Sequence, residues 1–427
     1  MDSRWFVVRP ANPLIISDKE LKWRLSPTAI LVKMQANNEN QSSVVKGDAA
    51  WRKRESYRRR REWFWQCIVF AAVIGLLYLF GQNIFENLQA RDIRSGFAFL
   101  SDRASFEIGE SMIAVSSNDS FARMFLAGML NTVRVAVLAI ITATVLGVIV
   151  GLMRLSQHPL VRFLGMAHVE VYRNIPLLIQ LFAIYLVITE FLPDSFDPIH
   201  FGSWAMLSKA GLQFSVPEHL WQVNTASLLF GLIAFFILKR YWRKRLTSLV
   251  ATCNAIVSAV LLALVLWLAA GAVLGWSQPH QEGFLVTGGA SATPEFIALW
   301  VGLTTFTSAS IAEIVRAGVL AVPSNQWSAS SALGMTRLQT VSYVILPQSL
   351  RLVIPPMASQ YMNLTKNSSL AVIIGYPDIV SVGNTSIVIM GQALEAIVII
   401  MMVYLLLNLI IAVIMNRVNA GVIAAPR

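Results

Sequence analysis

The residues of this sequence most able to do chemistry are ionisable side chains within long apolar stretches. Arg134 lies near the beginning of the apolar stretch 124–153, where an unpaired charge would be costly in a membrane. A guanidinium at this depth could hold a carboxylate through two parallel hydrogen bonds. It could also form a structural pair with an acidic neighbour such as Glu395, or extend to the membrane surface. The sequence leaves all three roles open for Arg134.

Two glutamates each precede an arginine by about one turn of a helix. Glu313 with Arg316, and Glu170 with Arg173, are therefore predicted to form structural pairs rather than a substrate site. Other polar residues in apolar stretches are candidates for lining a substrate pathway or for hydrogen bonds between helices: Asn131, Gln180, Asn363 and Asn367.

Signatures of catalysis are missing from the sequence. No phosphate loop of the form G-x4-G-K-[ST] occurs, so any ATP hydrolysis is predicted to take place on another chain. No grouping of histidine, cysteine and acidic residues predicts a metal site, and no nucleophile stands in a recognisable catalytic constellation. We therefore expect no catalytic residue, no metal and no cofactor on this chain, which is predicted not to be an enzyme.

The elements that position these residues are predicted to be membrane-spanning helices. Of the 427 residues, 56% are hydrophobic and 13% are charged, against about 25% charged in a soluble globular chain. Uncharged runs such as 63–81 and 248–276 are long enough to cross a bilayer, which takes about 20 residues. The alternating pattern of a β-barrel is absent. The fold class is therefore predicted to be an all-α polytopic membrane protein.

Eight spans are predicted from the apolar runs, and the fourth and fifth form a hairpin. The spans cover 63–81, 124–153, 174–192, 221–238, 248–276, 296–318, 365–382 and 393–416. The predicted domains are a basic N-terminal segment 1–62, a first helix 63–81, an outer loop 82–122, a domain 123–416 and a tail 417–427. The domain 123–416 includes the inserted hairpin 221–276 and a long loop 319–364.

Basic residues indicate the orientation of the spans. The net charge is +11, and 14 of the 34 lysine and arginine residues lie in the segment 1–62. Cytoplasmic loops carry an excess of basic residues, so both termini and the loops 154–173, 239–247 and 319–364 are predicted to be cytoplasmic. The arginine-rich stretch 52–61 could also bind anionic membrane lipids. Nucleic-acid binding is not expected, because membrane orientation explains the charge.

The loop after the sixth span contains the most informative pattern. Residues 326–334 read QWSASSALG, which predicts a helix rich in small residues that ends at Gly334. Leu346 and Pro347 are predicted to end or kink a second helical segment. The result is a helix–turn–helix outside the membrane, whose small side chains would let a partner protein approach closely. An amphipathic loop at the membrane surface is the alternative.

This loop resembles the "EAA" loop of ABC importer permeases, written E-A-A-x3-G-x9-I-x-L-P. The matching positions are Ser328, Ala329, Ser330, Gly334, Val344, Leu346 and Pro347, with Ser328 in place of Glu, Ser330 in place of Ala and Val344 in place of Ile. The resemblance implies contact with an ATPase through Gln326, Trp327, Ser328, Ala329, Ser330, Leu333, Gly334, Leu346 and Pro347. The missing glutamate favours a different sister permease that makes the stronger contact, and so a heterodimer.

Three further stretches are similar to polar amino-acid permeases of the histidine/glutamine type: 170–180, 312–318, and 346–351 followed by 366–370. The stretches 363–369 and 374–378 look most like the general L-amino-acid permeases of Gram-negative bacteria. The resemblance implies a five-helix type I importer core made of spans two, three, six, seven and eight. The first span and the hairpin are then additions.

The resemblance also implies a function. The chain would be the permease subunit of an ATP-driven, binding-protein-dependent importer of polar L-amino acids, with broad specificity for glutamate, glutamine, aspartate and asparagine. Its partners would be a sister permease, a cytoplasmic ATPase dimer that binds ATP and Mg²⁺, a periplasmic amino-acid-binding protein and the lipids of the bacterial inner membrane. Two alternatives remain. An ion-coupled secondary transporter would often show an inverted repeat, and a membrane enzyme would need catalytic residues.

Overall fold

The computed structural model describes residues 57–90 with gaps at 59, 77, 85 and 88–89, then 96–243, 248–282 and 285–423. Most of the predicted basic segment 1–62, part of the loop 239–247 and the end of the tail lie outside the described residues. The chain divides into two units, Met1–Asp92 and Ile93–Arg427. The described part of the first unit is an apolar helix, Arg60–Ile84, long enough to cross a membrane.

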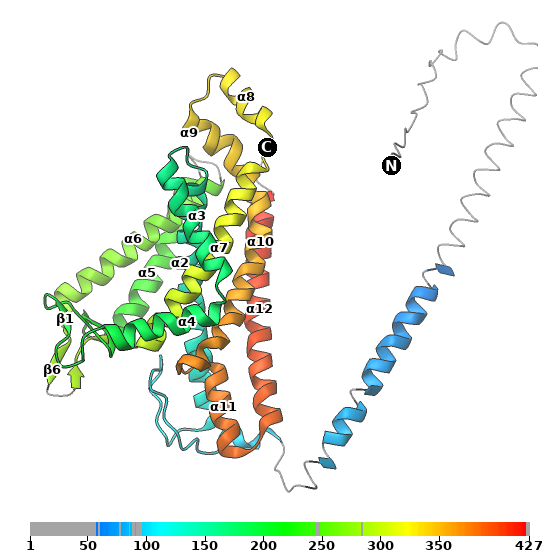
Figure 1. The fold of residues 1–427 in the computed structure, drawn as a ribbon, viewed down its shortest axis with the longest axis vertical. Helices are drawn as coiled ribbons and strands as arrows, with labels where there is room; N and C mark the ends of the chain where they lie inside the picture. The colour runs from blue at the N-terminus through cyan, green and yellow to red at the C-terminus, as the bar shows by residue number, and fades with distance from the viewer. Residues whose placement is uncertain are drawn as a thin grey trace, which may run out of the picture. The chain divides into compact units, whose positions relative to one another are not determined.

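The second unit is built around two long helices that lie side by side, α2 (Phe121–Arg154) and α7 (Pro294–Leu320). Their contact is close because small residues line it: Ala139, Ala143, Gly147, Gly151, Ala309 and Ala312 are all buried. Two further long helices, α10 (Leu346–Asn367) and α12 (Ala393–Ile423), pack on each other, and α10 also packs on α7. Together they form the upright bundle in Figure 1.

The chain returns from α2 as a bent pair of helices. α3 (Pro159–Asn174) packs on α2 and α7, and α4 (Leu177–Leu186) continues into a π-helical turn, η2 (Val187–Phe191). The two directions differ by 104° because Pro176 cannot continue the first helix. The predicted third span, 174–192, covers α4 and η2, and the predicted loop 154–173 contains the helix α3.

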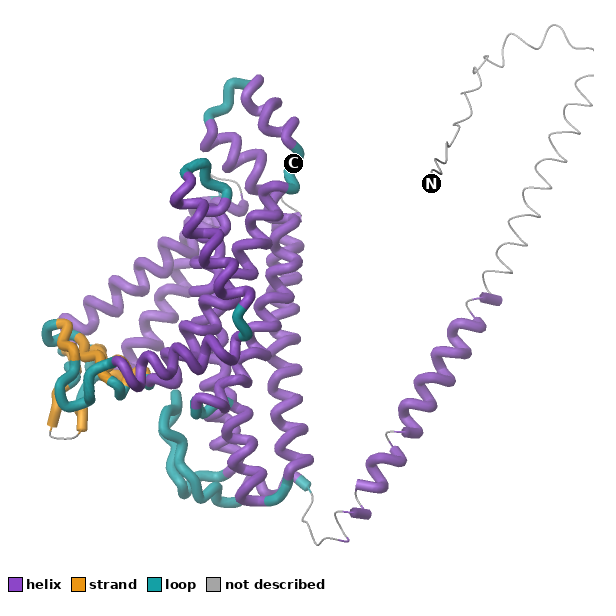
Figure 2. The backbone as a smooth tube through the Cα atoms, viewed as in Figure 1, coloured by secondary structure: helices purple, strands orange, loops and turns teal. Residues whose placement is uncertain are grey.

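The predicted hairpin consists of α5 (Leu220–Trp242) and α6 (Ser248–Leu274), which pack on each other and lean away from the bundle (Figure 1). Short strands join it to the bundle, and the sequence did not predict them (Figure 2). One antiparallel sheet has the order β1 (Ile199–Phe201), β2 (Ala205–Ser208), β3 (Gly211–Phe214) and β8 (Ala290–Ala292). Two smaller ladders pair β4 (Val216–Pro217) with β5 (Trp276–Ser277), and β6 (His280–Glu282) with β7 (Leu285–Thr287).

The segment after α7 folds as a helix–turn–helix at one end of the bundle, at the top of Figure 1. It comprises α8 (Ser324–Ala332), the short α9 (Arg337–Gln339) and a π-helical stretch, η3 (Thr340–Ile345), which runs directly into α10. The prediction that Leu346 and Pro347 end or kink a helix is wrong. Proline is favoured in the first turn of a helix, and Pro347 stands in the first turn of α10.

A second break follows α10. The chain passes through a 3-10 helix, η4 (Ser368–Ile374), and then enters α11 (Ile379–Met390) at an angle of 50°. The predicted seventh span at 365–382 therefore coincides with this break rather than with one helix. Residues before α2 form a short helix, η1 (Phe97–Ser101), and an extended loop.

The predicted all-α, polytopic fold class is confirmed. Six described helices are long and apolar enough to cross a membrane, and the number rises to 8, as predicted, if each of the two bent pairs is one span.

The α2–α7 contact provides a test of this packing. A Cβ atom at Gly147 would lie 2.7 Å from Ile311 and 2.9 Å from the carbonyl oxygen of Ser308. Gly147→Val should therefore force the helices apart and lower the free energy of unfolding by about 1–3 kcal/mol. The yield of monodisperse protein and its melting temperature would measure the loss. Gly421→Val is the control, because a Cβ atom there meets nothing within 4 Å; equal loss in both variants would contradict the prediction.

Candidate functional site

The helix–turn–helix presents a surface of small side chains. Ser328, Ala329 and Leu333 are exposed on or just after α8, and Leu333 reaches 80% exposure. The helix ends where predicted, because Gly334 takes a φ of +72°, which suits glycine. Thr336 then begins α9 with a capping box in which its side chain and that of Gln339 satisfy each other's backbone N–H.

The segment is tied to the helix that follows it. Ser330 is buried and donates to the carbonyl oxygen of Gln326 at 2.8 Å, while the side chain of Gln348 lies 3.5 Å from that of Gln326. Of the other predicted contact residues, Trp327 is half-buried in α8, and Leu346 and Pro347 lie at the base of α10 rather than in the turn. α8 is therefore connected to α10 through side chains and follows α7 directly in the chain.

Arg134 lies in a polar group that we call the Arg134 cluster, made of Glu110, Arg134 and Thr293. The guanidinium is 2.5 Å from Oε1 of Glu110 and stacks 4.1 Å from the centre of the Phe296 ring. The other oxygen of Glu110 accepts a hydrogen bond of 2.6 Å from Thr293. The partner suggested from the sequence, Glu395, instead accepts from the backbone N–H of Gly96. Of the three roles left open, the structural pair is the one observed, with a different acid.

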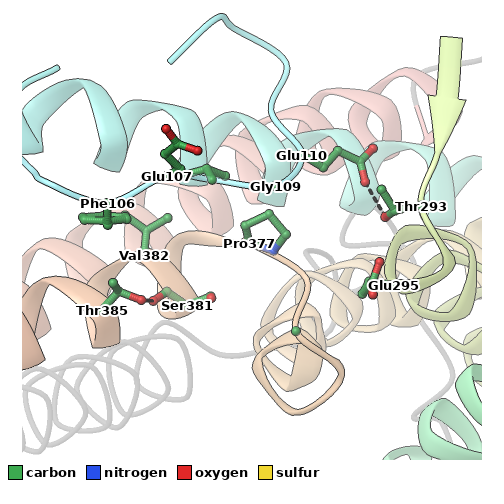
Figure 3. Close-up of a pocket in the computed structure, with 12 residues that line it drawn as sticks. Phe106, Glu107, Gly109, Glu110, Thr293, Glu295, Pro377, Ser381, Val382 and Thr385 are labelled. Carbon is green, nitrogen blue, oxygen red and sulfur yellow. Dashed lines mark hydrogen bonds between the residues drawn. The ribbon is translucent and has the colours of Figure 1, made fainter. Parts of the chain in front are cut away.

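A cavity of about 370 Å³ opens beside the Arg134 cluster (Figure 3). Its walls come from the loop before α2, the beginning of α7 and the break before α11. The polar groups that line it are Glu107, Glu110, Thr293, Glu295, Ser381 and Thr385. Three carboxylates lie among apolar neighbours such as Phe106, Ile108 and Val382, so the hollow at the end of the bundle opposite α8 is acidic and mixed in polarity.

Asn131 joins this region together. Its side-chain amide donates to the carbonyl oxygens of Glu110 and Pro377 and accepts from the N–H of Met112, at 2.8, 2.9 and 3.3 Å. Its hydrogen-bonding capacity is largely occupied by backbone groups, as expected of a fully buried amide. Asn131 therefore fixes the loop and the α11 break to α2.

The other predicted polar residues do not join this cluster. Gln180 donates to the carbonyl oxygens of Tyr172 and Ile175, which the break between α3 and α4 leaves without helical partners. On α10, Asn363 is exposed and Asn367 is half-buried. Among the described residues, neither forms a hydrogen bond with Asn131, Arg134 or Gln180.

Arginines surround Glu313 in a second group, the Glu313 cluster. Its oxygens lie 2.5 Å from Arg154, 3.3 Å from Arg173 and 3.9 Å from Arg316. One carboxylate thus links the ends of α2 and α3 to α7. The predicted pair of Glu313 and Arg316 is the longest of the three contacts. The predicted pair of Glu170 and Arg173 is wrong, because Arg173 turns to Glu313 and Glu170 accepts a hydrogen bond from Asn174.

Sequence reasoning missed Glu110, Thr293, Arg154 and the tie from Arg173 to Glu313. Helical spacing finds only partners within one helix, whereas these contacts join separate elements. The one available signal was charge: Arg154 ends an apolar stretch, and a buried cation there needs an acid from elsewhere.

Comparison with known proteins decides the family. Residues 227–424 match the family described as the inner membrane component of binding-protein-dependent transport systems. The general L-amino acid transport system permease protein AapQ of Rhizobium johnstonii is 37% identical over 374 residues, which cover 86% of this chain and 93% of AapQ. The chain belongs to this family.

Two further relatives of the permease extend the comparison. YhdX of Escherichia coli is 39% identical over 376 residues, covering 86% of this chain and 95% of that protein. The glutamate/glutamine/aspartate/asparagine transport system permease protein BztB of Rhodobacter capsulatus is 32% identical over 396 residues, covering 83% and 93%. The resemblance found in the sequence is confirmed, and the permease is not an ion-coupled secondary transporter.

The Glu313 cluster generates a stability prediction. Glu313→Gln would leave three arginines without their shared carboxylate, and Arg154 among them has a side chain only 9% exposed. We expect a loss of about 1–3 kcal/mol in the free energy of unfolding, less than for a fully buried pair because Glu313 is itself 29% exposed.

The melting temperature of the purified permease would measure this loss. Asp194→Asn is the matched control, since it breaks a single pair with Lys209 at the surface and should leave stability nearly unchanged. A Glu313→Gln variant as stable as the control would show that the cluster does not hold the three helices together.

Proposed function

We propose that this permease imports polar L-amino acids, with glutamate, glutamine, aspartate and asparagine among them. The proposal rests on the family to which the chain belongs. One relative is named for the transport of L-amino acids, and another for the transport of glutamate, glutamine, aspartate and asparagine. Over 80% of this chain is matched in both relatives. The carboxylates that line the cavity at the end of the bundle opposite α8 could bind the α-ammonium group that all of these amino acids share.

The partners follow from the same proposal. An ATPase dimer that binds ATP and Mg²⁺ would contact α8, where Ser328, Ala329 and Leu333 are exposed. A periplasmic binding protein would deliver substrate to the opposite end, and a sister permease would complete the pathway. Both termini would then be cytoplasmic and the loop before α2 periplasmic, in agreement with the distribution of basic residues.

The proposed mechanism is alternating access driven through α8. ATP binding would close the ATPase dimer and displace α8 together with its bonded neighbours. Because α8 follows α7 directly and η3 runs into α10, the displacement would tilt two core helices at once. ATP hydrolysis would reset them. Such coupling requires one structural element that has two arrangements. The ATPase contact and the substrate pathway must each favour one arrangement over the other.

Gly334 tests the role of α8. Its Cβ position is open, with nothing within 4 Å, so Gly334→Val would strain only the backbone turn at φ +72°. We expect normal insertion and assembly, but uptake of labelled glutamate, glutamine, aspartate and asparagine reduced by about ten-fold or more, because about 1–2 kcal/mol of strain displaces the turn. Uptake and ATPase activity of the reconstituted complex are the measurements.

Gly334→Asn is the matched variant, because asparagine tolerates the left-handed region better than a β-branched residue. It should retain more uptake than Gly334→Val. Wild-type uptake and normally stimulated ATP hydrolysis in Gly334→Val would exclude α8 as the coupling element.

Arg134 tests the substrate pathway. For Arg134 to hold a substrate carboxylate, the guanidinium would exchange Glu110 for the substrate during the cycle. Lysine keeps the charge but not the planar fork, so Arg134→Lys should raise the half-saturating amino-acid concentration while the complex still assembles. Transport kinetics and complex yield measure the two effects. An Arg134→Ala complex that assembles and keeps its affinity would leave Arg134 with a structural role only.

A further inference from the structure

The inserted sheet has one face made entirely of apolar residues. Cross-strand partners in an antiparallel sheet share a face, and the register pairs Ile199 with Leu207 and Phe201 with Ala205. The same register carries this face across the whole sheet: Ile199, Phe201, Ala205, Leu207, Leu212, Phe214, Ala290 and Ala292. No polar side chain interrupts it, although the sheet lies outside the apolar helices.

Only one half of this face is covered by the bundle. Leu212, Phe214 and Ala292, on β3 and β8, pack against the main hydrophobic core. On the edge strand β1 every residue is exposed, and Phe201 is 54% exposed. The apolar face therefore packs on the core at β3 and β8 and extends past the core at β1. Because the exposed residues of β1 share a face with the packed residues, they project to the side of the sheet on which the bundle lies.

The level of the sheet can be placed along α2. Arg134 and Arg154 mark the two ionic clusters, and a rise of 1.5 Å per residue between these positions gives about 30 Å. This is the thickness of the hydrocarbon core of a bilayer. Strand β8 leads directly into Thr293, which bonds to Glu110 in the Arg134 cluster. The sheet is thus attached at the boundary of the apolar layer on the side away from α8.

Tryptophans gather at the same level. Trp204, in the turn between β1 and β2, stacks edge-on against Trp276 at 5.0 Å, and Trp276 stacks against Trp267 of α6 at 5.4 Å. Trp221 at the start of α5 is exposed as well. Indole rings collect where headgroups meet the hydrocarbon core. The charged pair of Asp194 and Lys209, in contrast, lies by the turn at the other end of β2.

We propose that the overhanging face of the inserted sheet, formed by Ile199 and Phe201 and bordered by Trp204 in the adjoining turn, is a lipid-contact surface that rests in the outer boundary of the bilayer. Its occupant is phospholipid at the junction of headgroups and acyl chains. The hairpin that the sheet joins to the bundle also exposes apolar side chains that require lipid, among them Leu228, Ile233, Phe236, Val257 and Val265. The sheet would anchor the outer end of the hairpin, which the bundle itself contacts little.

A protein strand added to the free edge of β1 is the competing occupant, since an edge strand offers unpaired backbone groups. Lipid is favoured because the exposed side chains on this face are apolar and lie on the same side of the sheet as the membrane-spanning helices. Lipid and protein at this face would give different quenching of fluorescent probes attached to neighbouring residues of β1.

The experiment compares Phe201→Cys with His200→Cys, which project to opposite faces of one strand. Cys67 and Cys253 are replaced by serine, and an environment-sensitive fluorophore is attached to the single cysteine. The full-length permease, in complex with its partners, is reconstituted in phosphatidylethanolamine/phosphatidylglycerol vesicles. Lipids with a nitroxide near the headgroup serve as the membrane quencher, and iodide serves as the aqueous quencher.

A probe at position 201 should be blue-shifted and quenched by the nitroxide lipid about two-fold more than a probe at 200, as expected for a depth of about 5–10 Å. The probe at 200 should be quenched mainly by iodide. Equal quenching of both positions by iodide would overturn the proposal. Protection of position 201 from both quenchers would also overturn it, because a protein would then cover the face.

Discussion

A charged group at membrane depth must have a partner, and this requirement organises the permease. Arg134 and Arg154 stand at either end of the apolar part of α2, and each meets a glutamate from another element. Glu110 brings the loop before α2 to the bundle, and Glu313 brings α7 and α3. An unpaired cation at the centre of the hydrocarbon core would cost at least about 2.5–3.5 kcal/mol, and the pairs with glutamate let these two arginines lie at the boundaries of that layer. The Arg134 cluster and the Glu313 cluster therefore mark the two ends of the apolar part of α2. Each of them also connects α2 to other elements of the bundle.

The same requirement explains how the helices break. Where backbone groups leave the helical pattern inside a membrane protein, other groups of the protein must satisfy them. Gln180 does so at the break between α3 and α4. Asn131 and Thr132 do so before α11, and Asp378 accepts hydrogen bonds from the N–H groups of Val380 and Ser381. Polar residues that sequence reasoning assigned to a substrate pathway thus serve in part to hold bent spans in place.

Both ends of the permease are joined through α7. At one end, Thr293 caps the helix and bonds to Glu110, and the chain just before it belongs to the inserted sheet. At the other end, Glu313 gathers three arginines shortly before α8 begins. α7 packs closely against α2, because small residues such as Gly147, Ala309 and Ala312 line their contact. α7 thus connects the segment that leads into α8 with Thr293, which lines the far cavity.

The sequence by itself determined the features that depend on local composition and spacing. Long uncharged runs specify spans, and the small-residue stretch before Gly334 specifies a short helix and its end, because only neighbouring residues decide these. The tertiary structure alone decided which groups meet across the fold. Glu110 rather than Glu395 pairs with Arg134, and Arg173 contacts Glu313 rather than Glu170, since helical spacing carries no information about other elements. Pro347 lies in the first turn of α10 instead of ending a helix, and proline is tolerated in a first turn because its missing N–H is not required there. The apolar face of the inserted sheet appears only once antiparallel pairing places Ile199 and Phe201 beside their partners on β2.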